Sequence, residues 1–372
     1  MIAKSISFLD LSRNSPQKTQ AEQALSRVID RGIFLLGPEL DGLEREFASA
    51  FGVPFAAGVG SGTDALTLAL EASGAVNPGA GEEVITAALS AAFTPLAIYR
   101  AGAIPRFVDI DPATLQIDVA RIESCIGEKT RAIMPVHLYG HACDMRRIIE
   151  LADHHHLTVI EDACQAHGSI LDGRRLGTFG RAGAFSFYPT KNLGAFGDGG
   201  MVVASDQDLV RRVKMLRHGG QDTPYHHELL GCCSRLDELQ SAVLRLKLKT
   251  LDETNAIRQR LAGLYDEAFR DLDLVLLPSI ADFIPNRHLY PVRTPRRDEL
   301  RRFLHESGVQ TLVHYPVPLP LQPAFRRFVL AGQEFPVAQE TAKQILSLPL
   351  YPELKEEELQ YTIQAVRRFF NG

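Results

Sequence analysis

Short apolar runs alternate with amphipathic stretches along the first half of the chain. The runs have the length of strands, and the stretches between them carry apolar residues at helical spacing. We predict strands at residues 54–57, 84–87, 104–108, 132–136, 158–161, 182–187 and 200–204. We predict helices at residues 63–72, 94–101, 119–126 and 145–154. This alternation favours an α/β fold in which helices cover a largely parallel sheet.

The last two predicted strands are connected differently. A short glycine-rich loop lies between them and leaves no room for the crossover helix that a parallel pairing needs. We therefore expect these two strands to be antiparallel, so that the seven-stranded sheet is mixed but mostly parallel.

The second half of the chain has another pattern. Residues 236–269 are typical of one or two long helices, because their leucine and valine positions recur near helical spacing. We predict a strand at 288–293, a helix at 298–306, a strand at 310–314 and a terminal helix at 356–370. The length of 372 residues agrees with two domains, which we place at residues 1–250 and 251–372.

Composition excludes several classes of protein. Apolar residues make up 45% and charged residues 23%, which is typical of a globular protein. A net charge of −5 without a basic block argues against nucleic-acid binding, and no apolar stretch reaches the roughly 18 residues of a membrane span. The N-terminus has no signal-peptide core, and the five scattered cysteines indicate neither a zinc site nor a disulfide scaffold. We expect a cytoplasmic protein without a metal site or a membrane partner.

Lys191 is the first candidate for chemistry. It lies between an apolar run and a glycine-rich turn, within residues 185–194 (Phe-Ser-Phe-Tyr-Pro-Thr-Lys-Asn-Leu-Gly). Desolvation in such a place lowers the pKa of the amine and makes it a nucleophile, which a Schiff base with an aldehyde requires. The alternative is a structural lysine, and for a lysine taken alone that is the commoner case.

Residues 58–66 (Gly-Val-Gly-Ser-Gly-Thr-Asp-Ala-Leu) form a second candidate site. A strand ends there, glycines turn the chain, and a helix begins near Thr63. The unpaired N–H groups and the dipole of a helix N-terminus favour a phosphate. The alternative is an ordinary helix start capped by Thr63. The segment matches neither the dinucleotide fingerprint nor the nucleotide-triphosphate loop.

Two acidic residues, Glu161 and Asp162, end a buried strand and form a third candidate site. Ligands of open α/β sheets bind outside the carboxyl ends of the strands. One of these carboxylates can hold a protonated ring nitrogen, and the other is then a structural ion pair or a partly solvated charge. Gln165 is a candidate for a hydrogen bond to a ring hydroxyl, and His167 fits a structural role equally well.

The three sites follow one another in chain order, each after a strand. Ser186 lies near Lys191, and its hydroxyl is a further candidate donor to a phosphate. A phosphate cradle, a carboxylate at a strand end and a lysine in a loop are together typical of a pyridoxal 5'-phosphate site.

The sequence resembles the DegT/DnrJ/EryC1/StrS family of sugar aminotransferases over nearly its whole length. The resemblance is carried by residues 61–66, 161–168, 185–194, 234–240 and 346–352. It implies the type I, aspartate-aminotransferase-like fold and a homodimer with shared active sites. The usual substrates would be keto sugars on a nucleoside diphosphate, with L-glutamate as the amino donor.

The resemblance also assigns roles to residues. It implies that Lys191 forms the internal aldimine, that Asp162 rather than Glu161 binds the pyridine nitrogen, and that Gln165 lies near the ring oxygen. It implies phosphate contacts from Gly62, Thr63 and Ser186.

Residues 225–227, 234–238 and 314–318 resemble the branch of the family that acts on 3-keto-6-deoxyhexoses linked to dTDP. Tyr188, Tyr225 and Tyr315 are the candidates for contacts with the sugar nucleotide. For each tyrosine the alternative is a packing residue with its hydroxyl in water. A 4-keto or a 3-keto-uronate nucleotide sugar is the alternative substrate.

Two positions depart from the family pattern. Cys233 stands where the family usually has an asparagine that reaches the neighbouring subunit's cofactor phosphate, and a thiol is a far weaker donor. Ala91 stands where an aromatic ring usually stacks on the pyridine, with Phe93 two positions on. We expect both changes to weaken cofactor retention unless Phe93 or another group compensates. Both changes are also compatible with a regulator that has the same fold but no catalytic activity. A sugar dehydratase is a further alternative, but family members of that kind resemble proteins with histidine in place of the lysine, so Lys191 argues against it.

Three other features are expected to be structural. The three histidines at 154–156 are predicted to end a helix, Cys232 and Cys233 have only Arg235 as a flanking cation, and the arginines at 296–302 are predicted to form a solvated helix face.

Overall fold

The computed structural model describes residues 5–13 and 18–371. Its centre is a seven-stranded sheet in the order β1-β9-β8-β5-β4-β2-β3. All seven strands predicted from the sequence are present: β1 Phe55–Val59, β2 Glu83–Ala87, β3 Ile104–Val108, β4 Thr130–Met134, β5 Thr158–Asp162, β8 Ala182–Ser186 and β9 Gly200–Ala204. β9 runs antiparallel to both β8 and β1, and the other pairings are parallel. The prediction of a mixed, mostly parallel sheet is confirmed.

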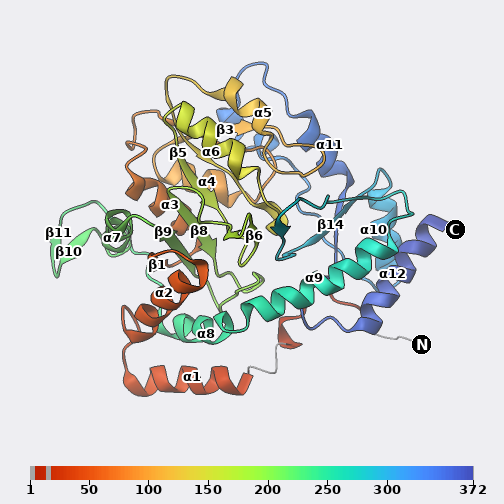
Figure 1. Cartoon of the computed structure of the whole chain (residues 1–372), viewed down its shortest axis with the longest axis horizontal. Helices are drawn as coiled ribbons and strands as arrows, with labels where there is room; N and C mark the ends of the chain where they lie inside the picture. The colour runs from red at the N-terminus through yellow and green to blue at the C-terminus, as the bar shows by residue number, and fades with distance from the viewer. Residues whose placement is uncertain (1–4, 14–17, 372) are drawn as a thin grey trace.

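Helices cover both faces of this sheet (Figure 1). The face that packs on α3, α4 and α7 buries Val202 of β9, and the opposite face, which packs on α2 and α6, buries Met201 and Val203. Adjacent strand residues thus enter different cores, as the two-residue period of a strand requires. The helices of this part are α1 Lys18–Arg31, α2 Pro38–Phe51, α3 Gly62–Ser73, α4 Phe93–Arg100, α5 Val119–Ile122, α6 Met145–His154, α7 Gln207–Leu216 and α8 Glu238–Leu248.

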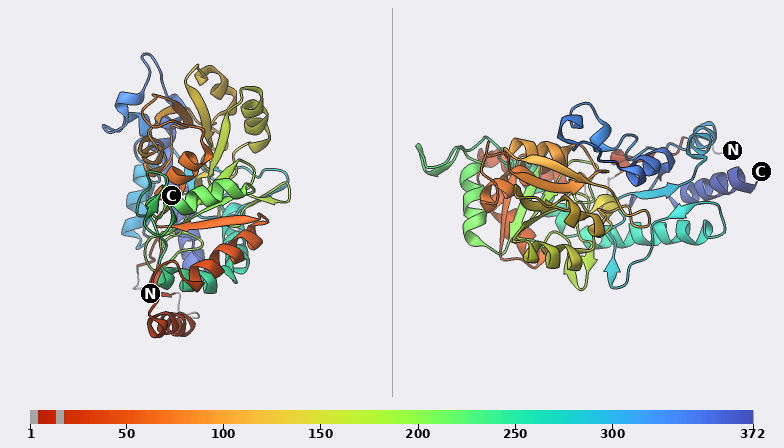
Figure 2. Two further views of the ribbon diagram at one scale, coloured as in Figure 1. Left: turned by 90° about the vertical axis from the view of Figure 1, so that its left-hand side faces the viewer. Right: turned by 90° about the horizontal axis from the view of Figure 1, so that it is seen from above.

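A separate apolar core lies in the C-terminal part of the chain. It contains α9 Leu251–Ala268, α10 Arg297–Glu306, α12 Glu356–Asn371 and a three-stranded antiparallel sheet of β12 Val275–Leu276, β14 Tyr290–Arg293 and β15 Ile345–Leu348. α11 Pro336–Gln344 leads into β15. Figure 2 shows this part extending to one side of the large sheet. The division of the chain at residue 250 stays a prediction.

The predicted strand at 310–314 is wrong. Leu312 makes only an isolated bridge with Ser347, and β15 is the strand that pairs with β14 in the small sheet. Residues 236–269, which were predicted to form one or two long helices, form two, α8 and α9, separated at residues 249 and 250.

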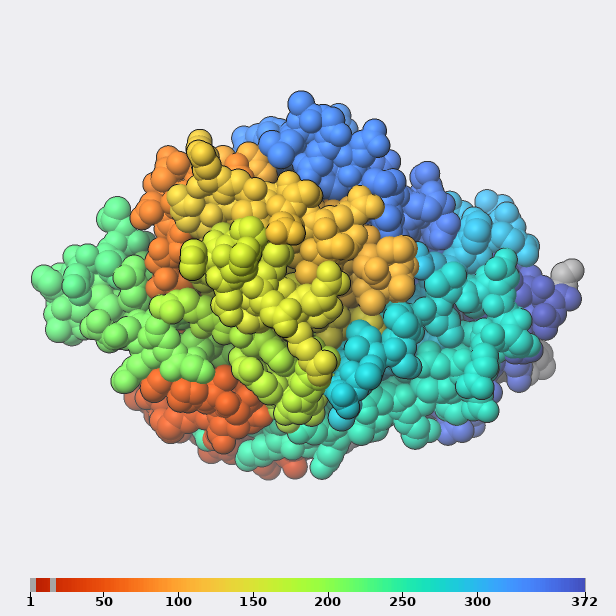
Figure 3. All heavy atoms as spheres, turned by 45° about the horizontal axis from the view of Figure 1, so that its top comes forward, coloured from red at the N-terminus to blue at the C-terminus, as the bar shows by residue number. Residues whose placement is uncertain are grey.

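Short elements complete the structure. They are β6 Ile170–Leu171, β7 Arg174–Arg175, β10 Gln221–Thr223, β11 His226–His227, β13 Phe283–Ile284 and the 3-10 turns Leu11–Arg13, Glu123–Cys125, Leu138–Gly140, Leu319–Leu321 and Arg326–Phe328. The β10–β11 hairpin projects away from the body of the molecule, and Figure 3 shows it as part of the light-green projection on the left. Within residues 5–13 and 18–371, no helix has both the length and the apolar character needed to cross a membrane.

Candidate active site

A cavity of about 1700 Å³ opens at the carboxyl ends of the central strands. The residues after β1, β2 and β5 line it, and so does the end of β8. The C-terminal part of the chain supplies another part of the wall, from α9, α10, the segment before β14 and residues 310–315, and Phe8, Leu9 and Leu11 also line the cavity. The cavity therefore lies where ligands of parallel α/β sheets bind.

The start of α3 provides one end of the cavity. Ser61 caps the helix, because its Oγ accepts a hydrogen bond from the N–H of Asp64 at 3.1 Å. The alternative of a helix capped by Thr63 is therefore wrong. A Cβ added at Gly62 would lie 2.5 Å from the Cβ of Ser186, so only glycine lets the helix start come this close to β8. Gly62, Thr63 and Ser186 line the cavity together, and their role as a phosphate cradle stays a prediction.

Asp162 is the last residue of β5 and is 5% exposed. Its Oδ2 accepts a hydrogen bond from the Thr94 hydroxyl at 2.7 Å, and its Oδ1 accepts one from the N–H of Cys164 at 3.1 Å. Two donors hold the carboxylate in one orientation on the cavity wall. A buried carboxylate held this way is suited to bind a cationic group of a ligand.

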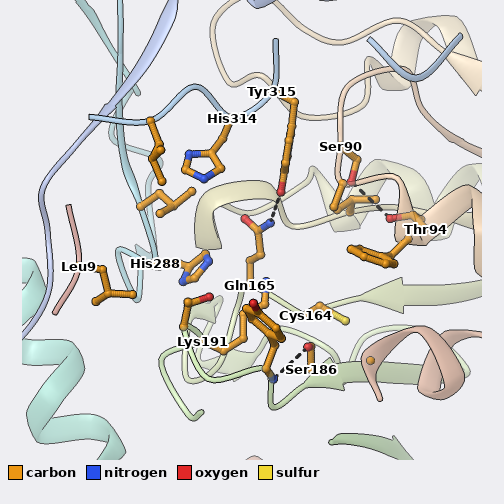
Figure 4. Close-up of a pocket in the computed structure, with 18 of the residues that line it drawn as sticks. Leu9, Ser90, Thr94, Cys164, Gln165, Ser186, Lys191, His288, His314 and Tyr315 are labelled. Atoms are coloured by element: carbon orange, nitrogen blue, oxygen red, sulfur yellow. Dashed lines mark hydrogen bonds between the residues drawn. The ribbon is translucent and has the colours of Figure 1, made fainter. Parts of the chain in front are cut away.

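Gln165 lies three residues after Asp162 in the chain. Its Oε1 accepts a hydrogen bond from the N–H of Tyr139 at 2.7 Å, which leaves its Nε2 as the donor that faces the cavity. That donor reaches the Tyr315 hydroxyl at 3.3 Å (Figure 4). Burial raises the pKa of Tyr315 to about 12, so the hydroxyl keeps its proton at neutral pH.

Lys191 lies in the loop between β8 and β9 and lines the same cavity. Burial lowers the pKa of its amine below the usual value, and the nearby Cys164 and Asp162 oppose the shift. The amine is therefore neutral, and nucleophilic, over a wider pH range than that of an ordinary lysine.

These groups fit pyridoxal phosphate. A helix start with a serine hydroxyl suits the phosphate, an oriented carboxylate suits the ring nitrogen, and an amine of lowered pKa suits the aldehyde. All three open on one cavity.

Some residues of interest in the sequence lie elsewhere. Tyr225, in the β10–β11 hairpin, is 95% exposed and is not among the described residues that line the cavity, whereas Tyr188 and Tyr315 line it. His167 is buried in the core, where it packs against Phe185. Burial lowers the pKa of His167 to about 3, so the ring is neutral.

Glu161 is fully buried and structural. Its carboxylate lies 3.0 Å from Nε2 of His137 and accepts hydrogen bonds from the N–H groups of Gly177, Phe179 and Gly180. It therefore fixes the turn before β8, and the alternative of a partly solvated charge is wrong.

The two departures from the family pattern differ in their surroundings. Ala91 and Phe93 both line the cavity, and Phe93 is 61% exposed. Cys233 is exposed and accepts a hydrogen bond from Arg235 at 2.9 Å.

Arg296, Arg301 and Arg302 are exposed as predicted, and Arg301 and Arg302 also line the cavity. Arg297 departs from that prediction, because it is largely buried and donates to the main-chain oxygens of Ala342 and Ile345.

Sequence reasoning missed three groups that shape the site. Thr94 orients Asp162 through its hydroxyl, and Tyr139 orients Gln165 through its N–H. His288 lies on the cavity wall. The partners of Thr94 and Tyr139 are distant in the sequence, so no local pattern could have revealed them. The number of residues that separates Thr94 from Asp162, or Tyr139 from Gln165, does not indicate a contact either.

The fold and the site define a pyridoxal-phosphate-dependent enzyme with the aspartate-aminotransferase-like fold. The chain belongs to the DegT/DnrJ/EryC1/StrS aminotransferase family, which it matches over residues 16–367.

Three relatives illustrate the range of this family. The dTDP-3-amino-3,4,6-trideoxy-alpha-D-glucose transaminase of Streptomyces venezuelae is 45% identical over 366 residues, which cover 98% of this chain and 96% of that protein. A pleiotropic regulatory protein of Geobacillus stearothermophilus is 42% identical over 369 residues, 98% of each chain. The crystal structure of S. venezuelae DesV in complex with a ketimine intermediate superposes with a TM-score of 0.96 at 44% identity and covers 100% of both chains.

Proposed function

We propose that the protein transfers an amino group from L-glutamate to C3 of a dTDP-linked 3-keto-6-deoxyhexose. The observation that carries the proposal is the Lys191 amine of lowered pKa in one cavity with the Asp162 carboxylate. The choice of C3 and of dTDP is supported by the name of the Streptomyces relative, which is 45% identical over nearly the whole chain.

Each cofactor contact has a residue suited to it. Pyridoxal phosphate supplies the electron sink that stabilises the carbanion of the amino donor. Asp162 would hold the ring nitrogen in its protonated form, and Nε2 of Gln165 would donate to the ring oxygen. Gly62 and Thr63, through their N–H groups, and Ser186, through its hydroxyl, would bind the phosphate.

Lys191 would have two tasks. Its amine would hold the cofactor between turnovers, and it would accept the α-proton of the donor and return a proton to the acceptor carbon. Because burial favours the neutral amine, the group is available to accept that proton at a lower pH than an ordinary lysine would be.

The sugar nucleotide would bind in the outer part of the cavity, beyond Lys191. Tyr188 and Tyr315 line the cavity and would contact the sugar. Tyr225 would contribute from a second subunit, since its own hairpin projects into solvent in the single chain.

We therefore propose a homodimer with shared active sites, and a cytoplasmic location in which the five unpaired cysteines stay reduced. The fully exposed Leu230 beside the hairpin and the exposed apolar segment Ile33, Phe34, Leu35 and Leu36 support a subunit contact. Light scattering should give twice the chain mass. Mixing Lys191→Ala with Tyr225→Ala chains should restore activity if Tyr225 serves the partner's site, and a mixture no more active than its parents would contradict that role.

The substrate is tested by a panel of 3-keto and 4-keto nucleotide sugars with L-glutamate, including a 3-keto uronate. The proposal expects 2-oxoglutarate to appear with the dTDP-linked 3-keto-6-deoxyhexose and not with Lys191→Ala. Faster turnover of a 4-keto sugar or of a uronate would replace this substrate with that one. Release of a dehydrated sugar without use of glutamate would instead indicate a dehydratase.

A second candidate function is a regulator without catalysis. Ala91 and Cys233 favour it, and so does the name of the Geobacillus relative. A protein that binds pyridoxal phosphate weakly and converts no sugar of the panel would favour this candidate over the transaminase.

A further inference from the structure

His288 is a buried histidine on the cavity wall that the roles above leave unused. It lies two residues before β14, is 6% exposed and lines the cavity. Figure 4 shows the side chains of His288 and Lys191 among those that line this cavity.

A network of amides fixes the tautomer of His288. Nδ2 of Asn192 donates to the main-chain oxygen of Asn286 at 3.0 Å and to Oδ1 of Asn255 at 2.8 Å. A main-chain oxygen can only accept a hydrogen bond, so the side-chain atom of Asn192 that contacts it must be the amide nitrogen. The other terminal atom of this side chain is therefore the oxygen, Oδ1, which can only accept. That Oδ1 lies 2.9 Å from Nδ1 of His288, which must therefore carry the proton.

The other ring nitrogen of His288 is left with a lone pair. Among residues 5–13 and 18–371, no group hydrogen-bonds to this Nε2. The atom is accessible from the cavity, unlike the two ring nitrogens of His167, which are completely buried. Burial, and after it the charge of Lys191, keep the pKa of His288 well below its usual value. The ring is therefore a neutral acceptor on the wall of the cavity that Lys191 also lines.

We propose that His288 is a positioning residue for Lys191. Its Nε2 accepts a hydrogen bond from the Lys191 ammonium group while that group carries the proton taken from the amino donor. The proton stays on Lys191 and returns to the reacting carbon, so His288 orients the group and gains no charge. Because Asn192 follows Lys191 directly, one side chain anchors both the loop and the ring that faces the amine.

The inference rests on the proposed function for its assay, which follows the exchange of the α-proton of L-glutamate with deuterium oxide. This reaction needs no sugar substrate. Two variants separate the two halves of the ring. His288→Asn keeps a donor for Asn192 and removes the acceptor from the cavity, whereas His288→Gln places an amide oxygen near the position of Nε2.

We expect His288→Asn to slow the exchange roughly 10- to 100-fold, the size of a hydrogen bond to a charged group, with cofactor affinity and melting temperature unchanged. His288→Gln should retain more activity than His288→Asn. Wild-type exchange in His288→Asn, or a loss of rate that only follows a loss of cofactor affinity, would overturn the proposal.

A second measurement does not depend on folding of the variants or on the donor. Nitrogen NMR of histidine-labelled wild-type protein should show Nδ1 of His288 protonated and Nε2 unprotonated at neutral pH. A proton on Nε2 would overturn the inference. If the wild-type protein exchanges the α-proton of no amino acid, the proposed function fails, and this spectrum still decides whether His288 presents an acceptor.

Discussion

Replacing Thr94 by valine removes a donor from the buried carboxylate at the centre of the site. The Thr94 hydroxyl donates to Oδ2 of Asp162 at 2.7 Å, and both side chains are buried. Valine keeps the shape of threonine, so the variant removes the hydrogen bond and opens no large cavity. The N–H of Cys164, 3.1 Å from the other oxygen, still donates to Asp162 in the variant.

The magnitude follows from the charge of the acceptor. A hydrogen bond to a charged group contributes about 1.5–3 kcal/mol, so Thr94→Val should lower the unfolding free energy of the cofactor-free protein by about that amount. Cofactor affinity should fall as well, because Asp162 would be less firmly oriented, by roughly tenfold for each 1.4 kcal/mol of interaction lost.

Urea unfolding at a fixed protein concentration measures the first effect, and absorbance titration with pyridoxal phosphate measures the second. Thr94→Ser keeps the hydroxyl and is the matched control. Ser90→Ala is a second control, because Ser90 contacts the Thr94 hydroxyl at 3.3 Å but does not bond to Asp162. If Thr94→Val and Thr94→Ser have equal stability and equal affinity, the role assigned to Thr94 is wrong.

Three further changes test other parts of the site. Gly62→Ala places a Cβ 2.5 Å from that of Ser186, so overpacking of about 1–3 kcal/mol should weaken binding of pyridoxal phosphate, and an unchanged dissociation constant would contradict the cradle. Glu161→Gln sets an amide NH₂ group against several N–H donors and should lower the unfolding free energy by roughly 3 kcal/mol in urea without removing any group from the cavity; wild-type stability would refute the structural role. The lowered pKa of Lys191 means that the neutral amine persists as pH falls, so in the cofactor-free protein an amine-specific reagent followed by peptide mass spectrometry should label Lys191 half-maximally at a pH below the value of about 10.4 for an unperturbed lysine. Half-maximal labelling at or above that value would show that burial does not govern this amine.

The large sheet could be predicted from the sequence because its signals are local. Each strand is a short apolar run, and the loop that carries Lys191 is too short for a crossover, which gave the antiparallel pairing of β8 and β9. The strand expected at 310–314 failed because a strand needs a partner along its length. Leu312 finds only one bridge to Ser347, which already belongs to β15.

Part of the site could likewise be predicted from the sequence, and part of it could not. Asp162 lies at a strand end, Gly62 at a helix start and Lys191 in a short glycine-rich loop, and the local pattern and the family resemblance both mark these places. Thr94 and His288 act through partners that only the folded chain brings close. The family resemblance ranked Asp162 above Glu161, and Asp162 is the one of the two that lines the cavity. The sequence could not show that Glu161 is completely buried and held by four donors.

The most direct test of the central claim is to find the lysine that carries the cofactor. The protein is incubated with pyridoxal phosphate, reduced with borohydride, digested and mapped by mass spectrometry. The account predicts a phosphopyridoxyl group on Lys191 in the wild-type protein and on no residue of Lys191→Ala. Stoichiometric modification of a different lysine, or an unmodified Lys191 in protein saturated with the cofactor, would contradict it.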